Sequence, residues 1–137
     1  QGAEERALVG EAIGRMRGHA VDSCDRLGIA DLAALLAEAT FVLSNDTSVM
    51  HLAGAVGTPV VALFGPTAPH LYGPRGERDL VFYKHVYCSP CLSNYNLKLS
   101  RCTDPVCMRA ITVDEVVAGI ETHLLHPAPT AAAGERP

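Results

Sequence analysis

The sequence contains no tryptophan and few aromatic residues of any kind, which make up 5% of its 137 positions. Charged residues are also sparse at 19%, while 48% of the chain is hydrophobic, much of it alanine and valine. This balance argues against a disordered chain. It predicts one globular domain whose core consists of small side chains.

Long basic runs, long apolar runs and a secretory signal are missing as well. The formal net charge is −4 and no more than two basic residues follow one another, which argues against a nucleic-acid-binding surface. No apolar stretch approaches the length that crosses a bilayer, and residues 1–17 carry charges throughout. We therefore expect a cytoplasmic protein without a transmembrane segment. Because the sequence begins with Gln rather than Met, we also expect a piece of a longer chain.

Cysteine occurs in an odd number, five, which is unusual for a secreted protein held together by disulfides and indicates a reducing compartment. Cys24 stands apart and is expected in the core. The spacing of the other four is C-x2-C-x10-C-x4-C: Cys88, Cys91, Cys102 and Cys107. Two close thiolate pairs can hold a structural zinc ion, although the second pair is wider than the usual C-x2-C. Free thiols or a disulfide are the alternatives.

Apolar periodicity predicts helices and strands that alternate along the chain. Helices are expected at residues 3–17, 29–39, 47–56 and 112–125, and strands at residues 40–44, 59–64 and 79–83. The run at 59–64 is apolar throughout, which is typical of a parallel strand buried on both faces. The helix at 47–56 is apolar on nearly every side, so we expect it to be buried and to end at Gly57 and Pro59. The alternation predicts an α/β fold with a parallel sheet.

The two ends of the chain carry signals of their own. Thr112 and Glu115 form a capping box at the start of the last helix, where each side chain can bond the other's backbone N–H. Residues 126–137 are low in complexity and are expected to be disordered. No strand precedes the first helix, so we expect the chain to begin inside a domain and to lack that domain's first strands.

The densest group of polar residues lies in the stretch "SNDTSVMHLA", residues 44–53. It follows a predicted strand and opens a helix, whose first N–H groups lack partners and carry partial positive charge. Ligands of open parallel sheets bind beyond the carboxyl ends of the strands, so the junction predicts a site for an anion, most often a phosphate. Thr47 and Ser48 add hydroxyl groups, and Asp46 can accept hydrogen bonds from a sugar. Thr67 follows the next strand and falls on the same edge.

The same residues also have a simpler interpretation. Asn, Asp, Thr and Ser before an apolar helix are ordinary helix caps, and residues 45–48 fit that pattern. His51, inside the apolar part, is either a functional residue or a buried structural histidine, and the second is the commoner outcome. The residues alone leave both interpretations open.

Residues 44–67, "SNDTSVMHLAGAVGTPVVALFGPT", resemble the signature of glycosyltransferase family 9, the bacterial heptosyltransferase family. Its members share Asp-Thr/Ser-Gly at a strand end, His-Leu in a helix, Gly-x-Pro, and Phe/Tyr-Gly-Pro-Thr after the next strand. This chain matches nearly all of that pattern, which is far more specific than a lone glycine motif. Weaker similarity extends on both sides, over roughly residues 2–125.

The resemblance implies a GT-B glycosyltransferase, in which two Rossmann-like domains enclose the active site. Residues 1–125 would form part of the C-terminal, nucleotide-sugar-binding domain, with a cysteine-rich insert at about 88–107. The implied reaction is inverting and metal-independent, requires no cofactor, and moves a heptose-like sugar from a nucleotide diphosphate such as ADP-heptose to a lipopolysaccharide or other surface-glycan acceptor. The implied place is the cytoplasm, at most peripheral at the inner membrane.

The family pattern also assigns donor-binding roles. Asp46 should contact the donor sugar, and Thr47 and Ser48 should present backbone N–H groups to the diphosphate. Glu4, or Glu5 with a shifted gap, should bind the ribose, and Leu27 should pack on the adenine. The remaining members of the expected donor-binding set are His51 and Thr67.

This chain departs from the family pattern in two respects. Ser48 replaces a glycine, the residue that allows a positive φ and the closest backbone approach. The N-terminal domain, which should carry the catalytic base, is missing, so we expect no catalytic residue in this chain and no activity from it alone. The alternative function is a non-catalytic interaction module stabilised by zinc, in which the junction at residues 45–48 is only a helix cap.

Overall fold

A computed structural model describes residues 3–96 and 99–126, except for the side chains of residues 3, 4 and 95. The chain divides into two compact units, residues 1–35 and residues 36–137. Residues 126–137 were predicted to be disordered. Residue 126 is described, and residues 127–137 lie outside the described residues.

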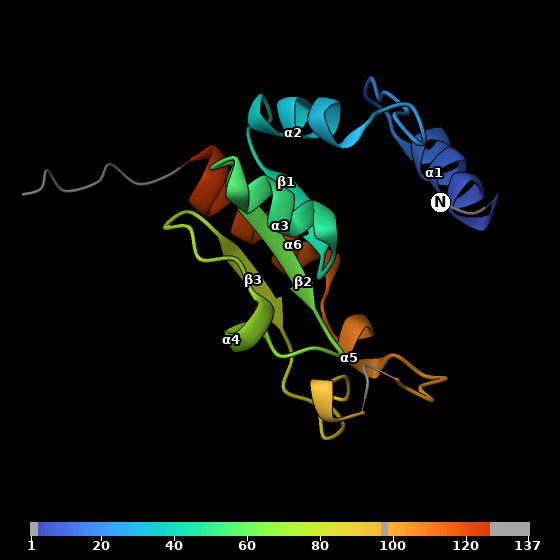
Figure 1. Ribbon diagram of the computed structural model, residues 1–137, viewed down its shortest axis with the longest axis vertical. Coiled ribbons are helices and arrows are strands. Elements are labelled where there is room, and N and C mark those ends of the chain that lie inside the picture. Colours follow the sequence, from blue (N-terminus) through green and yellow to red (C-terminus); the bar gives the residue numbers. More distant parts are fainter. Residues whose placement is uncertain (1–2, 97–98, 127–137) are drawn as a thin grey trace, which may run out of the picture. The chain divides into compact units, whose positions relative to one another are not determined.

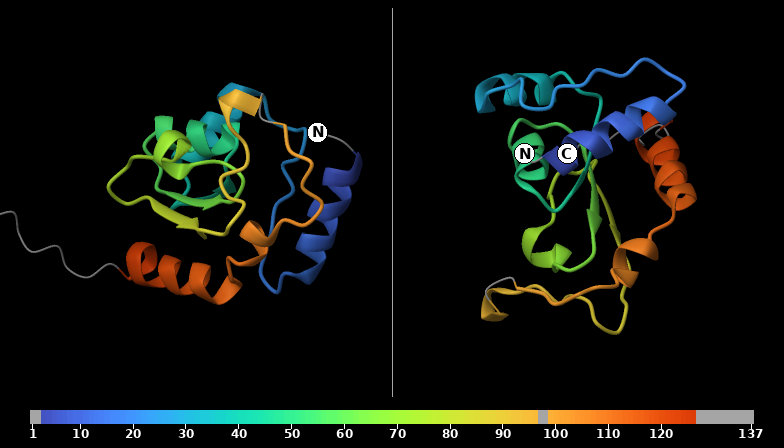
Figure 2. Two further views of the ribbon diagram at one scale, coloured as in Figure 1. Left: turned by 90° about the horizontal axis from the view of Figure 1, so that it is seen from below. Right: turned by 90° about the vertical axis from the view of Figure 1, so that its right-hand side faces the viewer.

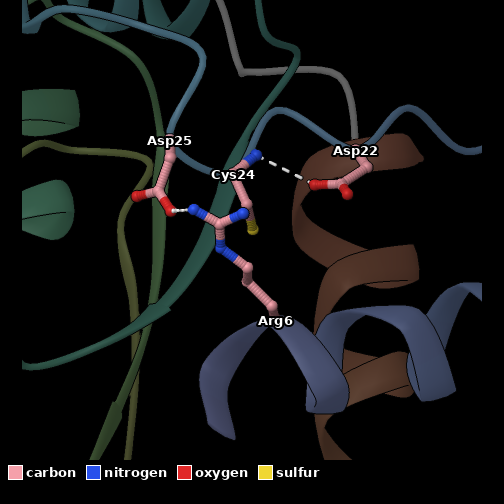
Figure 3. Close-up of polar contacts among 4 residues, drawn as sticks. All are labelled: Arg6, Asp22, Cys24 and Asp25. Carbon is pink, nitrogen blue, oxygen red and sulfur yellow. Dashed lines mark hydrogen bonds and ion pairs between the residues drawn. The ribbon is translucent and has the colours of Figure 1, made fainter. Parts of the chain in front are cut away.

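The first unit is built around helix α1 (Ala3–Arg15), close to the helix predicted at 3–17. Arg15 and Glu11 form an ion pair of 2.6 Å one turn apart on α1. Arg6 forms a second ion pair with Asp25, which lies in the loop after the helix (Figure 3). Asp25 adopts a positive φ of 55°, a conformation that Asp tolerates better than most residues. Helix α2 (Ile29–Ala37) then leads into the second unit.

Cys24 lies in the same loop and is partly exposed rather than in the core, so that expectation is wrong. Its backbone N–H donates to the Asp22 carboxylate at 2.9 Å, an Asx turn that shapes the loop (Figure 3). This backbone bond is the main cause that lowers the pKa of Asp22. The Asp22 carboxylate also raises the pKa of the Cys24 thiol, because a hydrogen bond to the neutral thiol disfavours the thiolate.

The second unit contains a parallel sheet of three strands in the order β1-β2-β3 (Figure 1). The strands are β1 (Val42–Asn45), β2 (Val60–Phe64) and β3 (Leu80–Tyr83). Both pairings are parallel, with Val42 opposite Val60 and Val61 opposite Leu80. Four of the five residues of β2 are buried, as expected for a strand with neighbours on both sides. The predicted α/β fold with a parallel sheet is confirmed.

Helices cover both faces of this sheet, with α3 (Ser48–Ala55) on one side and α6 (Val113–Ile120) on the other (Figures 1 and 2). On the α6 side, buried Val61 packs with Val116 and Leu124. Gly119 belongs to the same contact, because a Cβ atom there would lie 2.7 Å from the Phe82 ring. Larger side chains at that position would push α6 away from β3.

Helix α3 is buried on one face only, which corrects the expectation of a fully buried helix. Met50 and Ala53 are completely buried, whereas His51 and Gly54 are exposed. The apolar character of the exposed face comes from Gly and Ala, whose small side chains tolerate water as well as a core. Gly57 ends the helix as predicted, with a positive φ of 83°.

The last helix begins with the predicted cap, because the Glu115 N–H donates to the Thr112 hydroxyl at 3.2 Å. The Glu115 carboxylate pairs with Lys84 at 2.8 Å. Lys84, together with the backbone and hydroxyl of Thr112, lowers the pKa of Glu115. Helix α6 continues as a π-helical turn, η2 (Glu121–Leu125), so the helical segment reaches the predicted end.

Three short pieces complete the described chain: α4 (Pro69–Tyr72), the 3-10 turn η1 (Asn94–Asn96) and α5 (Val106–Arg109). None of the helices in the described part of the chain has the length and hydropathy needed to cross a bilayer.

Candidate functional site

The carboxyl ends of β1 and β2 lie side by side, because Asn45 at the end of β1 is opposite Leu63 near the end of β2. The chain segments that follow the two strands therefore start at the same edge of the sheet. One segment opens α3 at Asp46 and Thr47, and the other contains Gly65 to Thr67. The sequence predicted that these two segments would share an edge, and the structure confirms this placement.

A cavity of about 260 Å³ opens between these segments. Its lining residues come from four parts of the second unit: Asn45, Asp46, Leu63, Gly65, Pro66, Thr67, Leu92 and Met108. We call this space the edge cavity. It brings together Asp46 and Thr67, two of the predicted site residues, and combines their polar groups with an apolar wall.

Thr67 is the most unusual polar residue of the edge cavity. Only 7% of its surface is exposed, yet its hydroxyl has no hydrogen-bond partner among the residues that the structure describes. Buried hydroxyls are nearly always paired, because an unpaired one loses its bonds to water without replacement. Thr67 lines the edge cavity, and its hydroxyl has hydrogen-bonding capacity that no described residue uses.

The N-terminus of α3 adjoins Asp46 and has no side-chain cap. Thr47 is the N-cap residue in an extended conformation, with φ −141° and ψ 171°, and its side chain makes no capping hydrogen bond. Its hydroxyl instead lies 3.1 Å from the Ser44 hydroxyl. The expected side-chain cap is therefore not formed by Thr47 in the described structure. Helix N-termini without such a cap can bind an anion through their first N–H groups.

Ser48 is the first residue of α3 and is exposed. It is not among the described residues with a positive φ, and right-handed helical backbone accommodates any L-residue. Serine in place of the family's glycine therefore imposes no backbone strain here. The difference is the presence of a hydroxymethyl group beside the helix N-terminus.

His51 is exposed rather than buried, so the interpretation as a buried structural histidine is wrong. Its side chain is 56% exposed, and its Nε2 lies 3.7 Å from Oδ1 of Asp46, whose side chain is 19% exposed. The two residues form an ion pair only when the histidine is protonated. His51 thus stands next to the edge cavity without lining it.

His51 lines a second, larger cavity of about 700 Å³, between α3 and residues 73–79. We call it the loop cavity. Asp79 fixes its loop, because its carboxylate accepts hydrogen bonds from the Val60 N–H at 2.8 Å and from the Gly76 N–H. Thr58 also lines this cavity, and its buried hydroxyl donates to the Leu36 carbonyl at 2.7 Å.

The predicted nucleotide-binding residues belong to the first unit. Glu4 lies in α1 and its side chain is outside the described part of the structure, while the alternative residue, Glu5, is exposed on the same helix. Leu27 lies before α2 and is 38% exposed. Their roles toward ribose and adenine stay predictions.

The four clustered cysteines are free thiols: Cys88 and Cys102 are exposed, Cys91 is partly exposed, and Cys107 is buried. Within residues 3–96 and 99–126, no group of three or more His, Cys, Asp or Glu side chains is arranged to hold a metal ion. The predicted zinc site is therefore not assembled in the described structure.

Leu92 and Met108 are the residues that the sequence analysis missed. Both line the edge cavity although they lie far along the chain from Asp46, in and beside the segment that carries the cysteines. Isolated apolar residues in a polar segment give no signal of their own. Only the fold brings them to the end of β2.

Comparisons with known proteins agree on one family. The family model described as glycosyltransferase family 9 (heptosyltransferase) matches residues 1–100. Lipopolysaccharide heptosyltransferase 1 of Pseudomonas aeruginosa is 30% identical over 91% of this chain and 38% of its own length. The enzyme of the same name from Salmonella typhimurium is 39% identical over 51% of this chain and 20% of its own length. This chain thus spans little more than a third of the first of these relatives.

A solved structure shows the same fold. The crystal structure of the glycosyl transferase family 9 from Veillonella parvula DSM 2008 matches with a TM-score of 0.73 and 24% identity, over 92% of this chain and 35% of that one. The resemblance carried by residues 44–67 is thereby confirmed over most of the sequence, and the chain belongs to glycosyltransferase family 9, the heptosyltransferase family.

Proposed function

We propose that this chain is the donor-binding part of an inverting, metal-independent glycosyltransferase. The enzyme would move a heptose-like sugar from a nucleotide diphosphate, such as ADP-heptose, to a lipopolysaccharide or other surface-glycan acceptor. The observation that carries the proposal is the edge cavity, where Asp46 and the unpaired Thr67 hydroxyl meet beside the uncapped N-terminus of α3.

The N-terminus of α3 is proposed to hold the diphosphate. The backbone N–H groups of Thr47 and Ser48 and the partial positive charge of the helix end attract phosphate oxygens. Ser48 is exposed, so its hydroxyl can donate a further hydrogen bond. The same groups stabilise the charge that develops on the diphosphate as it leaves, so we propose that the transfer needs no metal ion.

The adjoining edge cavity is proposed to hold the sugar. Carboxylates repel phosphate but accept hydrogen bonds from sugar hydroxyls, so Asp46 fits the sugar better than the diphosphate. Its position beside the helix N-terminus would place the anomeric carbon next to the bound phosphates. His51, 3.7 Å from Asp46, would orient the carboxylate.

The transfer itself is proposed to need groups outside this chain. A carboxylate of another part of the protein would deprotonate the acceptor hydroxyl, and the resulting oxygen would attack the anomeric carbon. The bond from that carbon to the diphosphate oxygen breaks, and the diphosphate leaves with the electron pair. Attack from the face opposite the leaving group inverts the configuration. We propose that the enzyme works in the cytoplasm, because this compartment supplies nucleotide sugars.

Replacing Asp46 with Ala in the longest natural form of the protein tests this proposal. We expect the kcat/KM for ADP-heptose to fall by at least about 100-fold, because the lost carboxylate leaves sugar hydroxyls unpaired in the transition state. Glu38→Ala is the matched control, because this exposed acidic residue lies outside both cavities. Unchanged donor kinetics in Asp46→Ala would remove the edge cavity from the donor site.

A further inference from the structure

One wall of the edge cavity is built by the segment that carries the cysteines. This segment is fastened to the loop after β2 by backbone hydrogen bonds. The N–H groups of Cys91 and Leu92 both donate to the Pro66 carbonyl, at 2.9 and 2.7 Å. The Ser89 hydroxyl donates to the neighbouring Gly65 carbonyl. Leu92 is therefore held against the cavity by its own backbone.

Helix α5 supplies the other half of that wall through a close contact with Gly65. A Cβ atom on residue 65 would lie 2.9 Å from Cγ of Met108 and 3.0 Å from Sγ of Cys107. Cys107 is buried, with 5% of its surface exposed. Glycine at position 65 thus lets α5 approach closely enough for Met108 to reach the edge cavity.

The edge cavity is lined by both polar and apolar side chains. Its lining residues include the polar side chains of Asp46 and Thr67 and the apolar side chains of Leu92 and Met108. A sugar ring presents both kinds of surface, with hydroxyls around its edge and C–H groups on its faces. The volume of about 260 Å³ lies below the range of pockets that hold whole drug-sized ligands, so it suits the sugar without the nucleotide.

We propose that Thr67, Leu92 and Met108 form the sugar-selecting end of the donor site. The inference rests on the proposed function and assigns the cysteine-bearing segment a role within it. Leu92 and Met108 select the sugar by size, because an apolar wall discriminates one carbon unit by roughly 10- to 200-fold. Thr67 selects sugars that offer a hydroxyl group, because a sugar without that group leaves the buried Thr67 hydroxyl unpaired.

Methionine methyl NMR gives a direct test on this chain. The sequence has three methionines, so ¹³C-methyl labelling yields three signals. Met108 lines the edge cavity, whereas Met50 is fully buried in the core and Met16 is 57% exposed in the first unit. We expect ADP-heptose to shift the Met108 methyl signal and ADP alone to leave it in place, with Met50 and Met16 unchanged by either ligand.

The amide NMR signals of Thr47 and Ser48 report on donor binding itself. They therefore distinguish a failure of this inference from a failure of the proposed function. Amide shifts with ADP-heptose and an unmoved Met108 methyl would overturn the sugar-selecting role while keeping the donor site. No shift at either place, at millimolar ADP-heptose, would overturn both. Equal Met108 shifts with ADP and ADP-heptose would assign the edge cavity to the nucleotide and overturn the inference.

Kinetics of the longest natural form give a second test. We expect Met108→Ala to change the ratio of kcat/KM for ADP-heptose to that for ADP-mannose by at least about tenfold, with inhibition by ADP unchanged. Met108→Leu keeps the volume of the wall and should keep the ratio, and Met16→Ala is the surface control. Thr67→Val should lower kcat/KM for ADP-heptose, and Thr67→Ser should restore it. An unchanged ratio in Met108→Ala together with unchanged kinetics in Thr67→Val would contradict the proposal.

Discussion

The two cavities of the second unit differ in volume and in whether their buried polar groups have hydrogen-bond partners. The loop cavity measures about 700 Å³, and two of its lining residues, Asp79 and Thr58, already have hydrogen-bond partners. The edge cavity measures about 260 Å³, and it contains Thr67, whose buried hydroxyl has no partner among the described residues. Paired polar groups stabilise a fold, whereas a buried unpaired group in a native structure calls for an explanation such as a functional role. The smaller cavity is therefore the better candidate for binding.

Removing the Asp79 carboxylate should have the largest effect on stability. Asp79→Ala breaks the hydrogen bonds to the Val60 and Gly76 N–H groups, and bonds to a charged group contribute about 1.5–3 kcal/mol each. We expect the free energy of unfolding in urea to fall by about 2–4 kcal/mol. Affinity for ADP-heptose should persist below the unfolding transition, and loss of binding in the folded variant would assign the loop cavity a ligand role.

Gly65→Ala should disturb the edge cavity by overpacking, whereas Asp79→Ala acts on the loop cavity by removing hydrogen bonds. The added methyl group meets Met108 and Cys107, and overpacking of this kind costs about 1–3 kcal/mol. We expect lower stability in urea and weaker donor binding together. Gly54→Ala is the matched control, because nothing lies within 4 Å of that Cβ atom and alanine favours the helix by about 1 kcal/mol. Equal effects of Gly65→Ala and Gly54→Ala would show that the close contact between Gly65 and α5 does not determine stability or donor binding.

Two buried threonines, one in each cavity, sharpen the comparison further. Thr58→Val removes one of two donors to the Leu36 carbonyl, which keeps its hydrogen bond from the Ala39 N–H at 3.1 Å, and should cost about 0.5–1.5 kcal/mol in thermal or urea unfolding. Thr67→Val removes a hydroxyl that bonds nothing in the described structure, so its stability should stay within about 0.5 kcal/mol or rise. A large loss of stability in Thr67→Val would show that this hydroxyl has a structural partner.

The ion pair between Lys84 and Glu115 lies outside both cavities and should have the smallest effect. Its side chains are 40% and 28% exposed, so screening by solvent limits its contribution to stability. Folding lowers the pKa of Glu115, so this stability is present above the unfolded pKa and is lost as pH falls through the folded pKa. We expect urea unfolding of Lys84→Met to show less loss of stability below pH about 4.3 than the parent chain. An identical pH dependence in Lys84→Met and the parent chain would show that the ion pair does not contribute to the free energy of unfolding.

Local signals predicted the elements of the fold well. The apolar run of β2, the end of α3 before Gly57 and the cap at Thr112 each depend on a few neighbouring residues, and each is found as expected. The parallel sheet followed from the alternation of these elements. Burial of α3 was predicted less well, because composition shows that a face is apolar but not that another element covers it.

The edge cavity was harder to predict than the helices and strands, because it depends on contacts between residues far apart in the sequence. The edge shared by Asp46 and Thr67 could be predicted, because parallel strands place their carboxyl ends together. Leu92 could not, since its approach depends on backbone bonds to Pro66 from a segment with no regular periodicity. Met108 could not either, since its approach depends on the close contact between α5 and Gly65. The cysteine spacing left zinc, a disulfide and free thiols open, and the described structure has free thiols. Leu92, from the same segment, lines the edge cavity.

An amide NMR titration of this chain with ADP-heptose tests the central claim most directly, because it reports on both cavities at once. The account predicts that the largest shifts fall on residues 46–48 and on Thr67, around the edge cavity. Residues 73–79, around the loop cavity, should move little. Shifts concentrated at residues 73–79, with residues 46–48 and Thr67 unmoved, would contradict it.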